Sequence, residues 1–490
     1  MVSIEQAQQE VQAATDRILR LAGQARVVQF ESFETKLWEQ VLCLGRAAVT
    51  LFLSVQSSHP LAAEYSKGDR RYRLRGTKTD KLGTRFGKVD FERPIARPVD
   101  DPRGAADRPI DRRLGLCSGF SLTVVTDIAR LCATLSFSNS RSLYREWFHW
   151  APASRAVSRM VDALGTKARE FLEWSPAPDD DGEFLVVEVD ARGAPMISPR
   201  EHQKRRRPKR KTVSGTKRNY RRMRRKLTRR PRRGKGQKSK NSKAAFVGVV
   251  YTLRRTPDGL EGPINKRLIA TFESHEALFV WLDREVKKRG YGTKRMLFLA
   301  DGSEHIWRLQ ERFFPDAEVC LDWYHAVEYL WKAGRCLHPE GSDELSEWVT
   351  KQAGRLYTGA IKAMMAELRS ELHRLSKAKD KDSRDKHDRL KGYSDYFKNN
   401  LSRLRYREML REDFDIGSGA VEGAVRNLIA IRLDGPGMRW GRGRSEQVLY
   451  LRCVLLNNQW SEFLRWLKRQ PQIVLAAQPE PALPYAAEAA

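Results

Sequence analysis

The segment from Arg295 to Trp331 constrains the fold of this chain more than any other stretch; it reads RMLFLADGSEHIWRLQERFFPDAEVCLDWYHAVEYLW. It contains two short apolar runs, MLFL and EVCL, and each run ends at an aspartate, Asp301 or Asp322. Short apolar runs bounded by turn signals predict buried strands, and an acid at the carboxyl end of such a strand lies where open α/β sheets bind ligands. The segment therefore predicts strand, helix and strand with carboxylates at one edge, although an ordinary polar turn after each strand fits the same pattern.

The charge of the chain points to a polyanionic partner. Its 490 residues, a length typical of roughly two to four domains, include 91 Lys and Arg against 61 Asp and Glu, a net charge of +30. An excess of this size indicates nucleic acid as the partner. One block, Lys204 to Lys240, contains 21 Lys and Arg in 37 residues and no acid. Because like charges at this density repel, we expect the block to be disordered or extended until it meets an anion.

Membrane and secretory proteins are not the expected classes. The longest apolar run near the start, Ala47 to Val55, is too short to cross a bilayer, and the N-terminal segment with Glu5 and Glu10 does not resemble a secretory signal. The six cysteines are spread over the chain and form no CxxC pair, which argues against a zinc ribbon and a disulfide framework. We therefore expect a soluble intracellular protein whose cysteines are buried free thiols.

The first part of the chain divides into three regions by pattern. Residues 1–56 have helical spacing, and residues 57–113 form a small basic β-rich module with candidate strands RYRL and KVDFERP. Residues 114–174 are helical again, and a helix-turn-helix or a plain helical bundle fits them equally well. A Pro- and Asp-rich stretch, Ser175 to Glu183, predicts a linker. The strand FLVVEVD that follows ends at Asp190.

From Phe184 onward the predicted elements follow the order β, β, β, α, β, α, β and then helices. This is the succession of the ribonuclease-H-like fold, so we predict an α/β fold with a mixed sheet flanked by helices and a helical insertion, after a mostly helical N-terminal DNA-binding region. The predicted boundaries are 175–325 for the first part of the core with a basic insertion at 203–243, 326–411 for the helical insertion, 412–470 for the second part of the core, and 471–490 for a disordered tail.

Three acids are placed to form a metal site in such a fold. Asp190 ends the first strand, Asp301 ends the fourth, and Glu422 lies on the helix expected over residues 416–433. Carboxylates suit Mg²⁺ because this hard cation demands oxygen ligands, and two such ions can activate an attacking oxygen and stabilise a leaving one. Small residues on both sides of Glu422 allow close approach of a ligand, but a solvent-facing Glu422 paired with Arg426 fits the same spacing.

Other residues are candidates for supporting roles. His325 follows Asp322 at three residues; this pair could bind metal, but a supporting or structural role is favoured. The Gly/Arg-rich stretch Arg432 to Arg444 suits phosphate contacts, with Trp440 for base stacking, although a structural loop is equally compatible. The residues predicted to contact DNA are Arg205, Arg206, Arg207, Lys209, Arg210, Lys211, Arg221, Arg222, Arg224, Arg225, Arg439, Trp440 and Arg442.

The second half of the chain resembles bacterial insertion-sequence transposases of the ISKra type and, more widely, Mutator-like DDE transposases. The resemblance runs from Phe184 to Phe463, somewhat over half of the chain. The motifs that carry it are VEVDARGAPM, GVVYTLRR, KRGYG, ADGSEHIW, FFPDAEVCLDWYHAVEYLW, SGAVEGAVRNLIAIRLDGPGMRWGRGRSEQVLYLR and NNQW.

This resemblance implies a role for each candidate acid. Asp190, Asp301 and Glu422 match the three catalytic, metal-binding acids of a ribonuclease-H-like domain, and Asp322 with His325 matches an accessory DxxH pair. The implied cofactor is Mg²⁺ or Mn²⁺, with two ions expected. The implied fold has a helical insertion between the fifth strand and the helix that bears the glutamate.

The implied function is a DNA transposase that cuts at transposon ends and joins the freed 3′-hydroxyl to target DNA. Its expected partners are both DNA substrates and further copies of itself on DNA, in the bacterial cytoplasm near the nucleoid, with no membrane. Two alternatives are a non-catalytic nucleic-acid-binding protein derived from a transposase and a structure-selective nuclease. Residues 57–113 contain no cysteine, unlike the zinc-ribbon-like sequence of many relatives, so DNA binding there would depend on charge and β structure.

Overall fold

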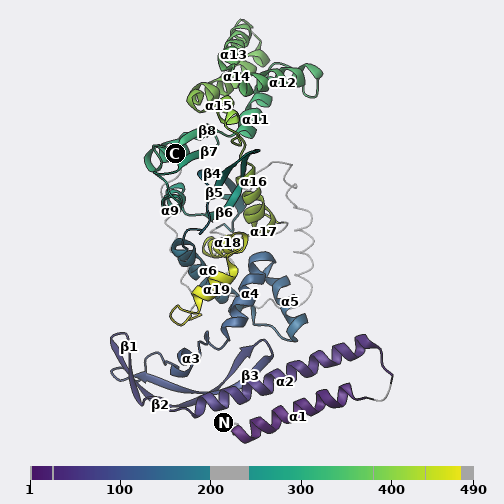
Figure 1. Ribbon diagram of the computed structural model, residues 1–490, viewed down its shortest axis with the longest axis vertical. Helices are drawn as coiled ribbons and strands as arrows, with labels where there is room; N and C mark the ends of the chain where they lie inside the picture. Colours follow the sequence, from purple (N-terminus) through teal and green to yellow (C-terminus); the bar gives the residue numbers. More distant parts are fainter. Residues whose placement is uncertain (1–2, 25–26, 199–241, 379, 436–437, 476–490) are drawn as a thin grey trace, which may run out of the picture. The chain divides into compact units, whose positions relative to one another are not determined.

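The computed structural model describes residues 3–24, 27–198, 242–378, 380–435 and 438–475 (Figure 1). The basic block Lys204 to Lys240 and residues 476–490 of the predicted tail, 471–490, lie outside the described residues. The prediction of disorder was wrong for residues 471–475, since Leu475 is buried and its N–H donates to Oγ of Ser118 at 2.9 Å. The chain forms two compact units, which we call unit 1, Met1–Leu172 with Tyr450–Ala490, and unit 2, Glu173–Leu449.

Unit 1 begins with a helical hairpin and a three-stranded antiparallel sheet. Its elements are α1 (Ile4–Ala22), α2 (Phe30–Ser58), β1 (Glu64–Lys67), β2 (Arg70–Thr84) and β3 (Gly87–Pro98), with strand order β1-β2-β3. The candidate strands RYRL and KVDFERP lie within β2 and β3. Leu53 of α2 packs in a core with Leu82, Val89 and Phe91 of the two long strands. The alternation along β3 places its apolar side chains toward this core.

The apolar run near the N-terminus is part of a longer helix than the sequence pattern predicts. Helix α2 has 29 residues, and within the described part of the chain it is the one helix whose length and composition would allow it to cross a membrane. The expectation from Ala47 to Val55 alone was wrong about length, because the helix continues on both sides of the run. In unit 1 this helix packs on α1 and on β3.

The remaining helices of unit 1 include several that pack through aromatic side chains. They are α3 (Pro109–Arg113), α4 (Leu122–Thr134), α5 (Phe137–Phe148), α6 (Ser154–Trp174), the end of α18 (Arg442–Leu456) and α19 (Trp460–Leu467). The ring of Phe171 lies 5.4 Å from that of Phe463 and 5.8 Å from that of Trp466. Arg452 donates from Nη1 to the carbonyl oxygen of Ala133 at 2.7 Å. The C-terminal helices are therefore held to α4 and α6.

Unit 2 is built on a five-stranded mixed sheet. Its strands are β4 (Phe184–Pro195), β5 (Ser242–Thr256), β6 (Gly259–Thr271), β7 (Arg295–Ala300) and β8 (Glu318–Leu321), in the order β6-β5-β4-β7-β8. The first three strands pair antiparallel, whereas β7 is parallel to β4 and β8 is parallel to β7. This is the predicted ribonuclease-H-like order, in which the first strand lies centrally beside the fourth, and the predicted α/β fold class is confirmed.

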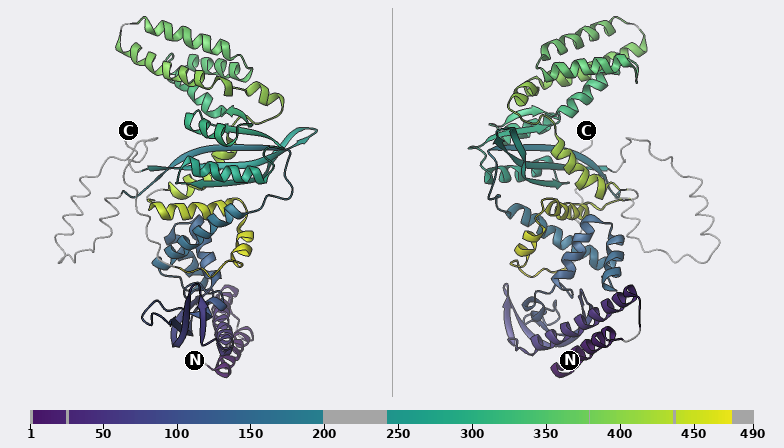
Figure 2. Two further views of the ribbon diagram at one scale, coloured as in Figure 1. Left: turned by 90° about the vertical axis from the view of Figure 1, so that its left-hand side faces the viewer. Right: turned by 45° about the vertical axis from the view of Figure 1, so that its right-hand side comes forward.

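Helices cover both faces of this sheet. The alternating direction of side chains along β4 shows which of the two faces each side chain points to. Figures 1 and 2 show α9 (His275–Lys288) and α16 (Gly419–Val425) on opposite faces. Gly248, which pairs with Val189 of β4, lies against Leu282 of α9. Because successive side chains point to opposite faces, Glu188 and Asp190 point to the face covered by α16.

A helical insertion lies between β8 and α16, as the sequence predicts. It consists of α11 (Trp323–Gly334), α12 (Asp343–Tyr357), α13 (Ile361–Ser376), α14 (Lys381–Asn399) and α15 (Tyr406–Arg411), and Figures 1 and 2 show α11 to α14 gathered beside β7 and β8. Tyr396 of α14 stacks on Tyr329 with ring centroids 3.6 Å apart. Its ring also lies against Gly302, where a Cβ atom would be 2.1 Å from Cε2 of Tyr396. A glycine after Asp301 is therefore required for the insertion to pack at this edge.

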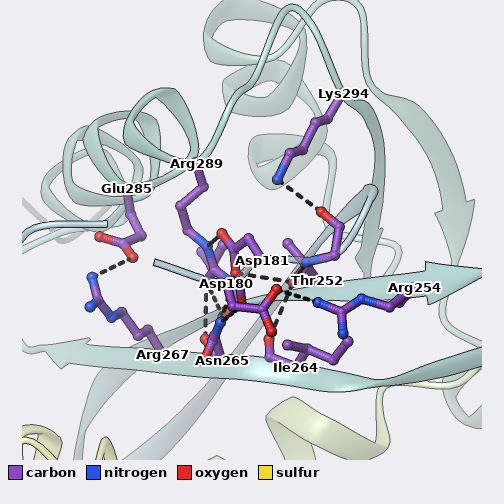
Figure 3. Close-up of polar contacts among 12 residues, drawn as sticks. Asp180, Asp181, Thr252, Arg254, Ile264, Asn265, Arg267, Glu285, Arg289 and Lys294 are labelled. Atoms are coloured by element: carbon purple, nitrogen blue, oxygen red, sulfur yellow. Dashed lines mark hydrogen bonds and ion pairs between the residues drawn. The ribbon is translucent and has the colours of Figure 1, made fainter. Parts of the chain in front are cut away.

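A buried ionic network fixes the opposite, amino-terminal end of β4 (Figure 3). Arg289 is fully buried and makes a bidentate pair with Asp181, from Nε to Oδ2 at 2.8 Å and from Nη2 to Oδ1 at 2.6 Å. Arg289 also donates from Nη1 to the carbonyl oxygens of Val250 and Asn265, at 3.2 and 3.1 Å. The stretch Ser175 to Glu183, predicted as a linker, is thus fastened to β5, β6 and α9 through Asp181.

Candidate active site

Three aspartates lie side by side where the parallel pairing of β4, β7 and β8 ends. The register pairs Val189 of β4 with Ala300 of β7, and Ala300 with Leu321 of β8. The residue that follows each of these is an aspartate: Asp190, Asp301 and Asp322. Asp301 and Asp322 directly follow their strands, as predicted, but the prediction that the first strand ends at Asp190 was wrong, because β4 continues to Pro195 through its pairing with β5. The N–H of Asp322 donates to the carbonyl oxygen of Ala300 at 2.9 Å, which extends this register by one residue. Both strand-end aspartates of the sequence pattern and the earlier Asp190 thus meet at one edge.

Asp190 lies within electrostatic range of the other candidate groups. Burial raises the pKa of the Asp190 carboxyl, and the negative charges of Asp301 and Glu422 raise it further. The N–H of Ala191, 2.6 Å from Oδ1, and the nearby His325 act in the opposite direction on this pKa. The structure therefore brings Asp190, Asp301, Glu422 and His325 into one electrostatically coupled group.

The three predicted catalytic acids differ in how firmly they are held. Oδ1 of Asp301 accepts a hydrogen bond from the N–H of Ser303 at 3.0 Å, whereas Glu422 is exposed in the first turn of α16. Within the described residues, no three His, Cys, Asp or Glu side chains are close enough to hold one metal ion as they stand. Their chemistry nevertheless fits Mg²⁺ or Mn²⁺, because the donors are hard carboxylate oxygens whose mutual repulsion a cation relieves.

Asp322 has both carboxylate oxygens engaged within the protein. It is 0% exposed, and its Oδ1 accepts from the N–H of Ser418 at 2.7 Å. Its Oδ2 accepts from the N–H of His325 at 3.0 Å and lies 2.5 Å from Nδ1 of the same residue. Burial alone would raise the pKa of Asp322, but these hydrogen bonds from His325 and Ser418 outweigh it and lower the pKa. The hydrogen bond to Asp322 raises the pKa of His325 to about 9, so this pair is ionic at neutral pH.

A buried acid that the sequence interpretation missed, Glu188, lies beside these groups on β4. It is 1% exposed; Oε1 accepts from the hydroxyl of Tyr251 at 2.8 Å and Oε2 from the N–H of Val421 at 2.7 Å. Burial raises the pKa of Glu188 to about 7 against the effect of these two hydrogen bonds. The signal in the sequence was its position: two residues before Asp190, it shares the face of the strand that carries the predicted catalytic acid.

Trp440 is not available to stack on a base, which corrects the prediction for the Gly/Arg-rich stretch. It is 8% exposed, and its Nε1 donates to the carbonyl oxygen of Leu433 at 2.9 Å. The guanidinium of Arg432 lies 4.7 Å from the centre of its ring. The main chain of Trp440 also bridges to the extension of β4, since its N–H donates to the carbonyl oxygen of Pro195. An indole with both polar and π contacts satisfied internally acts as a structural anchor.

The remaining predicted DNA contacts divide into two groups. Arg439 and Arg442, on either side of Trp440, are exposed. The ten basic residues predicted within the block lie outside the described residues: Arg205, Arg206, Arg207, Lys209, Arg210, Lys211, Arg221, Arg222, Arg224 and Arg225. The six cysteines are all free thiols, and five of them are buried. This agrees with the expectation from their spacing that they are buried free thiols.

Comparison with known proteins finds a likeness among solved structures. No protein-family model matches the chain, and no curated protein matches its sequence. Among solved structures, the chain is similar to the Drosophila P element transposase strand transfer complex, with 11% sequence identity and a TM-score of 0.23. That alignment covers 71% of this chain and 82% of the other chain.

Proposed function

We propose that this chain is the DNA transposase of a bacterial insertion sequence of the ISKra type, with unit 2 as its catalytic unit. The observation that carries the proposal is the arrangement of Asp190, Asp301 and Glu422. Asp190 and Asp301 lie where the parallel pairing of β4 and β7 ends, and Glu422 lies on the helix that covers the face to which Asp190 points. The negative charges of Asp301 and Glu422 raise the pKa of Asp190, which adds to this argument. Residues 184–463 also carry the transposase-like motifs.

Asp190, Asp301 and Glu422 would hold two Mg²⁺ or Mn²⁺ ions. When bound, such ions activate the attacking oxygen and stabilise the charge on the leaving one. The residues around them orient the site. Asp322 is fully engaged with Ser418 and His325, and the charged His325 ring adds a positive group beside the acids that can face a phosphate.

Cleavage and strand transfer on DNA that contains the element's ends test this proposal directly. With Mg²⁺ or Mn²⁺, the wild-type protein is expected to nick at the ends and to join the freed 3′-hydroxyl to a target duplex. Binding without cleavage would instead favour the nucleic-acid-binding protein derived from a transposase. Cleavage of branched DNA without joining would favour the structure-selective nuclease. We propose that the active protein assembles as a homo-oligomer on DNA in the bacterial cytoplasm.

The sheet of unit 1 offers a surface for duplex DNA. Four arginines at the start of β2 are exposed, namely Arg70, Arg71, Arg73 and Arg75, and Arg73 pairs with Glu64 across the strands at 2.5 Å. An antiparallel ribbon fits the major groove, and exposed arginines on it can reach phosphates or base edges. We therefore propose that β1, β2 and β3 contact DNA without a structural metal.

Substitution of Arg70, Arg71 and Arg75 by Gln is expected to weaken duplex binding and to reduce its salt dependence. Each phosphate contact that is lost lowers the slope of log K against log salt by about 0.9, so the slope should fall by up to about 3. Fluorescence anisotropy over a salt series measures this slope. A control with the same loss of charge replaces Lys287, Arg308 and Arg312 by Gln; these residues pair with acids on α9 and on α10 (Glu304–Phe313). Equal slopes for the two triple variants would contradict the role of β2.

A further inference from the structure

Helix α16 begins without a cap from its own sequence. Ser418 occupies the N-cap position, but its side chain makes no capping hydrogen bond. The first four N–H groups of a helix have no partner within the helix and must find one elsewhere. Here the N–H of Ser418 donates to Asp322 and the N–H of Val421 donates to Glu188, each at 2.7 Å. Two buried carboxylates from the sheet thus take the place of a local cap.

These two carboxylates fix the start of the helix at two separate points of the sheet. Glu188 lies on the central strand β4 and Asp322 follows β8, with β7 between them. A third long-range hydrogen bond joins the N–H of Trp323 to the carbonyl oxygen of Ile416 at 3.0 Å. Because the contacts lie on different strands, they restrain both the position and the rotation of the first turn of α16.

The side chain of Glu188 is itself held in place from a neighbouring strand. The hydroxyl of Tyr251 on β5 donates to Oε1 of Glu188, whereas the N–H of Val421 donates to Oε2. Both oxygens are therefore assigned, and the carboxylate has one orientation in which both hydrogen bonds form. A buried acid costs desolvation that an apolar side chain of similar size avoids. Its presence on a central strand calls for a role that an apolar side chain does not fill.

We infer that Glu188 is a positioning residue for the proposed reaction: it receives the amide of Val421 and thereby sets Glu422 opposite Asp190. Glu422 directly follows Val421 in the chain, and Asp190 lies two residues after Glu188 on the same face of β4. One strand thus supplies a metal-binding acid and the acceptor that places the helix bearing another. The inference rests on the proposed function, but the contact between Glu188 and Val421 can be tested without activity.

Glu188→Leu tests this role because leucine fills the space and removes both acceptor oxygens. Hydrogen exchange of the Val421 amide is expected to accelerate at least about tenfold. The kcat of DNA cleavage should fall by about 10–100-fold, the range typical of lost orienting contacts, while KM for DNA stays within about twofold. Glu188→Gln keeps an acceptor for the amide of Val421. The exchange rate of this amide and the kcat are therefore expected to stay close to the wild-type values. Tyr251→Phe, which removes one of the two hydrogen bonds to Glu188, should give a smaller loss of kcat with the same unchanged KM.

Glu285→Gln is the matched control. Glu285 in unit 2 is also 1% exposed. Its carboxylate pairs with the guanidinium of Arg267 at 3.1 Å and not with a main-chain amide of α16. Neither the exchange of Val421 nor kcat should change in this variant. Unchanged exchange in Glu188→Leu overturns the contact, and faster exchange with an unchanged kcat overturns the positioning role. If the wild-type protein cleaves no DNA, the proposed function fails while the exchange of Val421 still decides whether Glu188 holds α16.

Discussion

Replacement of Asp301 by Asn is expected to abolish DNA cleavage and strand transfer while DNA binding is kept. The variant preserves the size of the side chain and its hydrogen bond from the N–H of Ser303, so the turn after β7 should form as in the wild type. What it removes is the negative charge that a divalent metal requires beside Asp190. We expect the rate of cleavage to fall by about a thousandfold or more, with the affinity for DNA changed by less than about threefold.

Asp322→Asn is the informative comparison, because Asp322 ends the next parallel strand at the same level. Both of its oxygens already accept hydrogen bonds from Ser418 and His325, so we assign it an orienting role and expect a loss of about 10–100-fold. Single-turnover cleavage with Mg²⁺ and with Mn²⁺ measures both variants. If Asp322→Asn is inactive and Asp301→Asn retains activity, the roles of the two aspartates must be exchanged.

The sheet and the edge that carries the acids were predictable because they depend on local pattern. The runs FLVVEVD, MLFL and EVCL are apolar and short, and the structure places them in β4, β7 and β8. A turn after a strand needs a polar residue, so Asp301 and Asp322 were found where the apolar pattern stopped. The order of strands and helices then selected one known topology, and this topology brought Asp190 next to Asp301.

Tertiary contacts were not predictable in the same way. Glu188 is an acid inside the otherwise apolar run of β4, and the local sequence does not show what its side chain contacts. Its partners are Tyr251 on β5 and Val421, which lies 233 residues away. Trp440 lies among glycines and arginines that resemble an exposed loop, but the carbonyl group of Leu433 and the main chain of β4 bury it. In both cases the partner lies on another element, and the composition of the local segment does not reveal that partner.

The same limit applies to the segment before β4, whose composition of proline and aspartate predicted a linker. Asp181 is instead the acceptor for the fully buried Arg289, and the hydroxyl of Thr252 also donates to it at 3.1 Å (Figure 3). Burial alone would raise the pKa of Asp181, but the hydrogen bonds and charge of Arg289 outweigh it and lower the pKa. The pair joins the start of β4 to the end of α9, at the opposite end of the strand from Asp190.

Arg289→Ala is therefore expected to be the most destabilising single substitution at this end of the sheet. It removes the hydrogen bonds that Arg289 donates to the carboxylate of Asp181 and to the carbonyl oxygens of Val250 and Asn265. Removal of one partner from a buried ion pair typically costs about 3–5 kcal/mol of stability. Hydrogen exchange of β4 and β5 amides over a urea series measures this loss in unit 2. Arg289→Lys should recover little of it, because one ammonium group cannot replace the bidentate pair and both carbonyl contacts.

Arg254→Ala provides the control within the same network. Its guanidinium pairs with Asp180 at 2.5 Å, but the side chain of Asp180 is 82% exposed and that of Arg254 is 40% exposed. An exposed ion pair contributes about 0–1 kcal/mol, so this variant should remain close to wild type. If Arg289→Ala costs no more than Arg254→Ala, the buried pair is dispensable and β4 is held by its strand neighbours alone. If the difference is as expected, the segment before β4 is a structural part of the sheet, and the position of Asp190 depends on contacts at both ends of its strand.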